Sequence, residues 1–211
     1  MSSVIALFGA SGKTGREFLT LALQQGHRVQ ALVRRPDQFP VQHPDLTVIP
    51  GDVLNAQSVA RVVAGTDAVV SLFGHVKGSP PRVQTEGTNH IVAAMRTHGV
   101  RRLVSLSGGG LPFAKDQPKL ADKLIRGIMR VFVPNVLQDA IEHAQVLRAS
   151  GLDWTVVRGP RLTMQPATGH YRVGWVGVNA STSIGRADLA DFILKQVHSQ
   201  EFVESMPFVS Y

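Results

Sequence analysis

Three glycines at a spacing of three, Gly9, Gly12 and Gly15, stand between an apolar stretch at residues 4–8 and a helix-like segment at residues 16–25. The apolar run is typical of a buried strand, and glycine lets the chain turn tightly into the helix. The backbone can then approach a pyrophosphate, to which the helix N-terminus offers N–H donors. The pattern predicts a dinucleotide site, the alternative being a glycine-rich turn without a ligand. The predicted contacts are Gly9, Ser11, Gly12, Lys13, Thr14 and Gly15.

Two arginines end the next predicted strand. Residues 28–33 are followed by Arg34 and Arg35, and no acid stands there. A dinucleotide fold that selects NAD usually places an acid here for the ribose 2′-hydroxyl, whereas arginine accommodates the 2′-phosphate of NADP. The guanidinium is planar and always charged, which suits a phosphate. We therefore predict NADP(H) rather than NAD(H), with Arg34 as the main contact. The alternative for both arginines, as for Lys13, is a solvated charge.

Further strand and helix patterns alternate at the spacing of β-α-β units. Such alternation predicts a doubly wound α/β fold of the Rossmann type, with a parallel sheet covered on both faces. The length favours one NAD(P)-binding domain, residues 1–211, with a small C-terminal elaboration. Predicted strands span residues 46–50, 67–73, 101–106 and 153–158, with short strands within 171–178. Predicted helices span 55–64, 83–98, 120–133, 135–150 and 187–198.

Several residues follow the predicted strands where ligands of this fold bind, beyond the carboxyl ends. Asp52 and Val53 are expected near adenine, although Asp52 could instead cap a turn. Phe73 and Gly74 follow the fourth strand, and Gly74 lets the backbone approach the ribose. Ser107, at the end of the fifth strand, is expected to face the nicotinamide and the substrate. The alternative role for Ser107 is to hydrogen-bond nearby backbone groups.

Several catalytic groups are missing from the sequence. The sequence has no cysteine. It also has no cluster of histidine, aspartate and glutamate at metal-ligand spacing, so we predict no metal. His75 is expected to be a surface histidine. The only tyrosines are Tyr171 and Tyr211, and neither has a lysine four residues on, so the usual Tyr-x-x-x-Lys proton-delivery pair is absent. A hydride acceptor that needs little help from an enzymic acid fits better: a flavin, a linear tetrapyrrole or a quinone.

The chain carries a formal charge of +7, from 22 basic and 15 acidic residues. Because the arginines are dispersed and no nucleic-acid-binding signature is present, an anionic small ligand explains this charge better than nucleic acid. No apolar run is long enough to span a bilayer, and we expect no signal peptide before the first strand. We expect a soluble cytoplasmic protein with no membrane partner.

Eight segments spread over most of the chain share a family pattern: residues 8–15, 32–34, 51–54, 63–69, 91–95, 98–100, 146–152 and 165–171. In these segments the chain resembles the biliverdin-IXβ reductase/flavin reductase family, an NmrA-like branch of the atypical short-chain dehydrogenases/reductases. The resemblance implies an NADPH-dependent reductase that takes flavin as a substrate rather than a prosthetic group, with bilins as a second substrate class. It also implies a monomer.

Two departures from the family pattern concern the substrate side. The family serine corresponds to Ser107, but residues 108–110 are glycines where the family has bulky apolar residues, which should enlarge the pocket. The family histidine after the sixth strand corresponds to Arg161, between the expected cofactor contacts Pro160 and Leu162. Arginine cannot donate a proton, so any proton should come from water. Arg161 is instead expected to stabilise negative charge on the reduced acceptor or bind its phosphate or propionate. The alternative is a structural salt bridge.

Two other functions remain open from the sequence. A non-catalytic NADP(H)-sensing protein would also lack the tyrosine–lysine pair. A reductase of quinones or other small electrophiles would share the cofactor site. Ser107 has no neighbouring histidine or acid in the sequence pattern that would activate it as a nucleophile, so a hydrolase is disfavoured.

Overall fold

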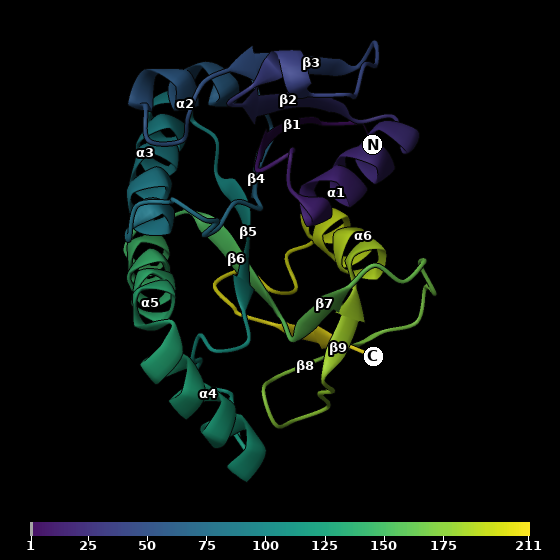
Figure 1. Cartoon of the computed structure of the whole chain (residues 1–211). Helices are drawn as coiled ribbons and strands as arrows, with labels where there is room; N and C mark the ends of the chain where they lie inside the picture. The colour runs from purple at the N-terminus through teal and green to yellow at the C-terminus, as the bar shows by residue number, and fades with distance from the viewer. Residues whose placement is uncertain (1) are drawn as a thin grey trace.

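The computed structural model describes residues 2–211. Its main strands are β1 (Val4–Phe8), β2 (Arg28–Val33), β3 (Leu46–Pro50), β4 (Ala68–Ser71), β5 (Arg102–Gly108), β6 (Asp153–Gly159), β8 (Arg172–Gly174) and β10 (Phe208–Ser210). They form one sheet in the order β3-β2-β1-β4-β5-β6-β10-β8 (Figure 1). Only β8 is antiparallel to its neighbour. From β1 to β3 the strands are added on one side of β1, and from β4 onward they are added on the other side. The junction between the parallel strands β1 and β4 is therefore the switch point where doubly wound folds bind ligands. The predicted Rossmann fold is confirmed.

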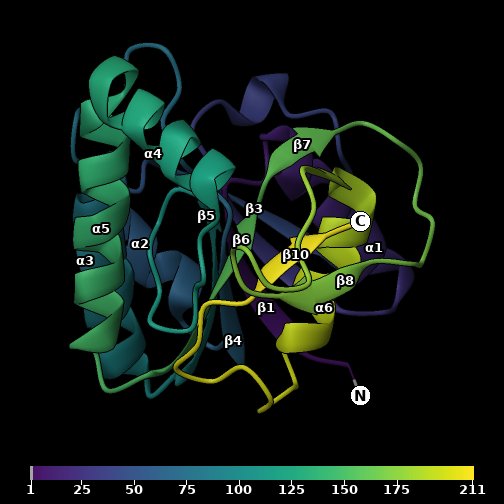
Figure 2. The same ribbon diagram turned by 90° about the horizontal axis from the view of Figure 1, so that it is seen from below.

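The helices are α1 (Lys13–Gln24), α2 (Ala56–Val63), α3 (Val83–His98), α4 (Leu120–Phe132), α5 (Pro134–Arg148) and α6 (Arg186–Gln196). Figure 2 shows α1 and α6 on one face of the sheet and α2, α3 and α5 on the other. Successive side chains of β1 point to opposite faces of the sheet, so this strand contributes to the hydrophobic core on both faces. Ile5 and Leu7 join the core under α1 and α6, while Ala6 and Phe8 join the core on the opposite face.

The helix ends follow local signals in the sequence. Helix α3 spans the predicted residues and ends at Gly99, whose φ of 71° is left-handed. Asn55 caps α2, accepting a 2.8 Å hydrogen bond from the Ser58 amide. Helix α1 begins three residues earlier than predicted, because the extended Gly12 already serves as its N-cap. The sequence patterns did not reveal the short strands β10, β7 (Arg161–Thr163) and β9 (Ser183–Gly185), of which the last two pair in a separate small sheet.

Helix α4 is amphipathic and contains no buried residue. It packs mainly on α5 and projects from the body of the molecule (Figure 1). None of the helices described in residues 2–211 is both long and apolar enough to cross a membrane. The large apolar side chains that α4 exposes are Leu120, Leu124, Ile125, Ile128, Val131 and Phe132.

A buried ion pair fastens the carboxyl end of β6. Arg158 is fully buried and meets Asp116 through two hydrogen bonds of 2.8 and 2.7 Å. The same guanidinium donates to the carbonyl oxygens of Leu111 and Met206. Burial alone would raise the pKa of Asp116, but Arg158 and two backbone amides lower it overall, so this carboxylate stays ionised. The pair holds the loop after β5 beside Gly159, at the edge of the cleft described next.

Candidate active site

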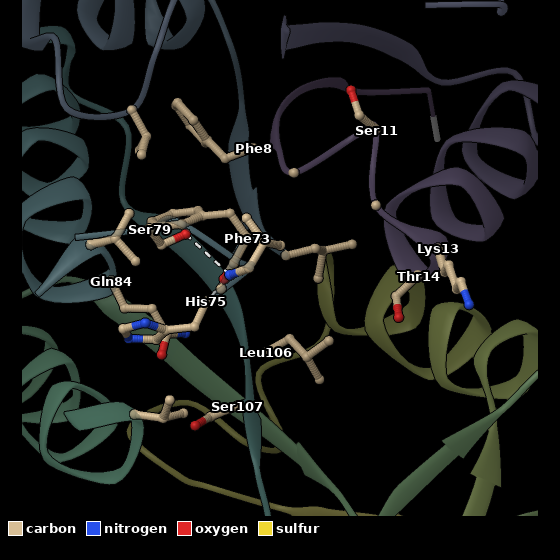
Figure 3. Close-up of a pocket in the computed structure, with 18 of the residues that line it drawn as sticks. Phe8, Ser11, Lys13, Thr14, Phe73, His75, Ser79, Gln84, Leu106 and Ser107 are labelled. Atoms are coloured by element: carbon tan, nitrogen blue, oxygen red, sulfur yellow. Dashed lines mark hydrogen bonds between the residues drawn. The ribbon is translucent and has the colours of Figure 1, made fainter. Parts of the chain in front are cut away.

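A cleft of about 590 Å³ opens at the carboxyl ends of β1, β2, β4, β5 and β6. Figure 3 shows Ser11, Lys13 and Thr14 on one side and Ser107, with other polar side chains, on the other. Of the sixteen predicted site residues, Gly15, Arg35 and Arg161 do not line it. Those that do are Gly9, Ser11, Gly12, Lys13, Thr14, Arg34, Asp52, Val53, Phe73, Gly74, Ser107, Pro160 and Leu162.

The glycine loop makes a cradle that only glycine permits. Gly9 has φ +90°, and a Cβ there would lie 2.6 Å from the backbone of Leu72 and Phe73. The first backbone hydrogen bond of α1 runs from Arg16 to Gly12, at 2.9 Å, so the amides of residues 13–15 have no intrahelical acceptor. No acid stands in the first turn of α1. These donors and the helix dipole fit a pyrophosphate.

Gly15 also has a packing role that the sequence did not predict. A Cβ on Gly15 would collide with the carbonyl oxygen of Gly9. The residue is buried and does not line the cleft. Glycine here therefore lets the first turn of α1 pack against the glycine loop, and the contact of its amide with a ligand stays a prediction.

The structure separates the two arginines that follow β2. Arg34 is exposed, lines the cleft, and makes no ion pair or side-chain hydrogen bond within residues 2–211. Arg35 lies outside the cleft and approaches only Gln38, at 3.5 Å. Asp52 lines the cleft and also accepts a 2.9 Å hydrogen bond from the Leu54 amide. The carboxylate therefore caps the turn after β3, which was the alternative to an adenine contact. The guanidinium available to a 2′-phosphate is that of Arg34.

Ser107 lies on the opposite side of the cleft. It is 8% exposed, and its hydroxyl makes no hydrogen bond to any residue in 2–211. The alternative that this hydroxyl satisfies local backbone is therefore not what the structure shows. The hydroxyl keeps its donor and its acceptor capacity for a group in the cleft.

The three glycines after Ser107 were expected to enlarge the pocket, but two of them do not. A Cβ on Gly109 would lie 2.8 Å from the Phe208 ring, and one on Gly110 would lie 2.9 Å from the Met129 side chain. Neighbouring side chains therefore already fill those positions. Only Gly108 lines the cleft and has open space at its Cβ position.

A different arginine occupies the place expected for Arg161. Arg161 is exposed on β7 and does not line the cleft, so the expectation that it faces the hydride acceptor is corrected. Arg186, the first residue of α6, lines the cleft instead. Its Nη1 donates a 3.1 Å hydrogen bond to the Leu162 carbonyl. The sequence signal that could have identified it was its position just after Gly185, at the start of a predicted helix.

His75 is not the surface histidine that was expected. Its ring lines the cleft, and its side chain is 15% exposed. Its Nε2 lies 2.7 Å from Asp139, a buried residue of α5. Sequence reasoning missed this pair because the two residues stand 64 positions apart.

Both tyrosines are committed to interactions away from the cleft. The Tyr171 hydroxyl donates to Asp191 at 2.6 Å and accepts from Lys195 at 3.1 Å. Burial and the Asp191 carboxylate raise the pKa of Tyr171 to about 12. The Tyr211 hydroxyl is held by Asp188 and the Gly185 amide. Since these are the only tyrosines, no phenol reaches the cleft to act as an acid.

A buried polar network supports the wall behind Ser107. His143 on α5 lies 2.8 Å from the Thr88 hydroxyl on α3 and 3.1 Å from the Ser105 hydroxyl on β5. Burial lowers the pKa of His143 to about 4, against a smaller raising effect of Asp139. The imidazole is therefore neutral, and it joins two helices to the strand that carries Ser107.

The lowered pKa of His143 predicts that the protein loses stability in mild acid. The pKa of His143 is lower in the folded than in the unfolded chain. As the pH drops below the pKa of the unfolded-state histidine, protons bind the unfolded chain but not the folded one, so the free energy of unfolding falls. From pH 7 to about pH 4.5 we expect wild type to lose about 2–3 kcal/mol more unfolding free energy than His143→Gln. Urea unfolding of both proteins across this range measures the difference. Parallel curves would contradict the assignment.

The fold and the cleft together are typical of a dinucleotide-binding protein. Residues 9–200 match the family described as NAD(P)H-binding, and the chain belongs to this family. A wide-type short-chain dehydrogenase/reductase from Veillonella parvula DSM 2008, solved in complex with NADP, has a TM-score of 0.80 at 20% identity and covers 100% of this chain and 95% of its own. ChuY from Escherichia coli O157:H7, described as an anaerobilin reductase, has a TM-score of 0.76 at 19% identity, over 98% and 96% of the two chains.

Two relatives differ in how much of their length matches this chain. The uncharacterised protein YwnB of Bacillus subtilis (strain 168) is 26% identical over 204 residues, which is 93% of each chain. A 3-beta-hydroxysteroid dehydrogenase of Mycolicibacterium neoaurum is 34% identical over 112 residues, which is 47% of this chain and only 30% of that protein. This chain therefore spans less than a third of the length of that relative.

Proposed function

We propose that this protein is an NADPH-dependent reductase that transfers hydride to flavins such as FMN, riboflavin and FAD, with linear tetrapyrroles such as biliverdin as a second substrate class. The observation that carries the proposal is the arrangement of the cleft. One side has the glycine cradle and an unpaired Arg34, and the other has the unbonded hydroxyl of Ser107 and no tyrosine. The description of ChuY as an anaerobilin reductase on the same fold supports the second class.

Each part of the cleft would hold one part of the cofactor. Bound NADPH supplies the hydride. The glycine-loop amides would bind the pyrophosphate, and Arg34 would bind the 2′-phosphate. Asp52 would contact adenine and Gly74 the ribose, while Ser107 would position the reacting groups through its hydroxyl. The contribution of these residues is positioning, which is a large part of catalysis when two ring systems must meet face to face.

Arg186 would take the role first expected of Arg161. It lines the cleft next to Leu162 and has no carboxylate partner within residues 2–211. Hydride transfer to a flavin drives negative charge onto the ring system, which a nearby guanidinium stabilises. The same side chain would also bind a flavin phosphate or a bilin propionate.

Steady-state NADPH oxidation tests the proposal. With FMN, riboflavin or biliverdin as acceptor, we expect NADPH-dependent turnover on the order of 1 s⁻¹ or faster, which is within the common range for enzymes. The absorbance loss of NADPH is followed with and without acceptor, and a quinone panel tests small electrophiles with the same assay. Absence of turnover with all of these acceptors would contradict the proposed reductase.

The second candidate is an NADP(H)-sensing protein without catalysis. It is favoured by one observation, the engagement of both tyrosines outside the cleft. The same assay separates the two functions. Tight NADPH binding without turnover on any acceptor supports the sensor, whereas turnover supports the reductase.

A further inference from the structure

His75 and Asp139 form a hydrogen-bonded pair at the substrate side of the cleft. His75 stands on the loop that follows β4, next to Gly74, and Asp139 lies on α5. Figure 3 shows the His75 ring among the cleft side chains, near Gln84 and Ser79. The loop is shaped by a 3.1 Å hydrogen bond from the Val76 amide to the Ser79 hydroxyl.

Asp139 is held as a carboxylate by several donors. It accepts hydrogen bonds from the amides of Gln84 and Thr85, at 2.8 and 2.9 Å, and from the Thr85 hydroxyl. Burial alone would raise the pKa of Asp139, but these bonds and the one from His75 lower it overall. An ionised carboxylate only accepts hydrogen bonds. The Nε2 of His75 must therefore carry a hydrogen and donate a hydrogen bond to Asp139.

The other ring nitrogen of His75 is left for the cleft. Its Nδ1 makes no hydrogen bond to any residue in 2–211, while the ring lines the cleft wall. A histidine fixed at one nitrogen by a buried carboxylate, with the second nitrogen facing a substrate site, has the arrangement of a general acid or base. Capping α3 explains the amide contacts of Asp139 but does not require a histidine in the cleft.

We propose that His75 is the proton donor of this reductase and that Asp139 is the residue that positions it. The inference rests on the proposed reductase function. The acceptor gains a hydride from NADPH and a proton from the Nδ1 of a protonated His75, which leaves NADP+, the doubly reduced acceptor and a neutral imidazole. A second proton, taken up from solvent through the open cleft, then protonates Nδ1 again, so that each turnover consumes one solvent proton. This assigns the proton, which the sequence alone left to solvent, to a specific side chain.

The test uses the full chain with the acceptor that wild type turns over fastest. For His75→Asn we expect kcat to fall by about 100-fold or more, the usual contribution of a general acid, and the NADPH dissociation constant to change less than twofold. Added imidazole should restore part of kcat in His75→Asn. Asp139→Asn keeps one oxygen, which can still accept from the Thr85 amide and hydroxyl, and should lower kcat with little change in KM. The control His170→Asn, an exposed histidine outside the cleft, should match wild type.

A second readout does not depend on turnover. In the protein without NADPH, ring ¹⁵N NMR should show His75 protonated at Nε2 and should lose this signature in Asp139→Asn. Unchanged kcat in His75→Asn with an active wild type would overturn the proton-donor role and leave the reductase standing. A wild type inactive on every acceptor would overturn both. A His75 protonated only at Nδ1 would overturn the positioning by Asp139.

Discussion

Gly9→Ala is expected to weaken NADPH binding by at least about 100-fold, which corresponds to about 2.7 kcal/mol. A Cβ at this residue would lie 2.6 Å from the backbone of Leu72 and Phe73, and the residue has φ +90°. The strand ends on both sides of the switch point would have to separate, which would displace the amides that face the pyrophosphate. Fluorescence titration with NADPH measures the loss.

A matched variant separates this effect from backbone strain. Gly65 also has a positive φ, +71°, but a Cβ there meets no atom within 4 Å, and the residue lies outside the cleft. Gly65→Ala should therefore carry a dihedral penalty of about 1–2 kcal/mol and keep wild-type affinity for NADPH. If Gly9→Ala binds NADPH as tightly as Gly65→Ala does, the glycine loop is not the pyrophosphate site.

Arg34→Ala is expected to remove the preference for NADPH. A hydrogen bond to a charged group contributes about 1.5–3 kcal/mol, so the KM for NADPH should rise by about 10- to 100-fold. The KM for NADH should change less than twofold, because NADH has no 2′-phosphate. Both constants come from initial rates with one acceptor at saturating concentration.

Arg35→Ala is the matched control for this variant. Arg35 is the neighbouring arginine, also exposed but outside the cleft. We expect its KM for NADPH to stay within threefold of wild type. Equal effects of Arg34→Ala on the two cofactors would remove Arg34 from phosphate recognition, and a larger effect of Arg35→Ala would transfer that role to it.

The sequence predicted which residues of the glycine loop and the strand ends line the cleft, because their signals are local. The glycine spacing, the β2 end and the strand patterns all lie within short windows, and parallel strands bring their carboxyl ends to one edge. Gly9, Arg34, Asp52, Gly74 and Ser107 accordingly line one cleft. Their contacts with bound cofactor stay predictions.

The substrate half depends on contacts between distant segments, which the sequence patterns could not give. His75 meets Asp139 because α5 packs against α3. Arg186 lines the cleft at the start of α6, directly after the three-residue strand β9, which pairs with the three-residue strand β7. Strands this short carry no usable periodicity. The family resemblance likewise assigned Arg161 by position in the sequence rather than by position in space.

Titration calorimetry of the protein with NADP+ and, separately, NAD+ tests most directly whether the cleft is built for a dinucleotide with a 2′-phosphate. We predict one binding site per chain and an affinity for NADP+ at least about tenfold higher than for NAD+, from the charge-assisted bond of Arg34. No heat with NADP+ at millimolar concentration, or equal affinities for the two dinucleotides, would contradict it.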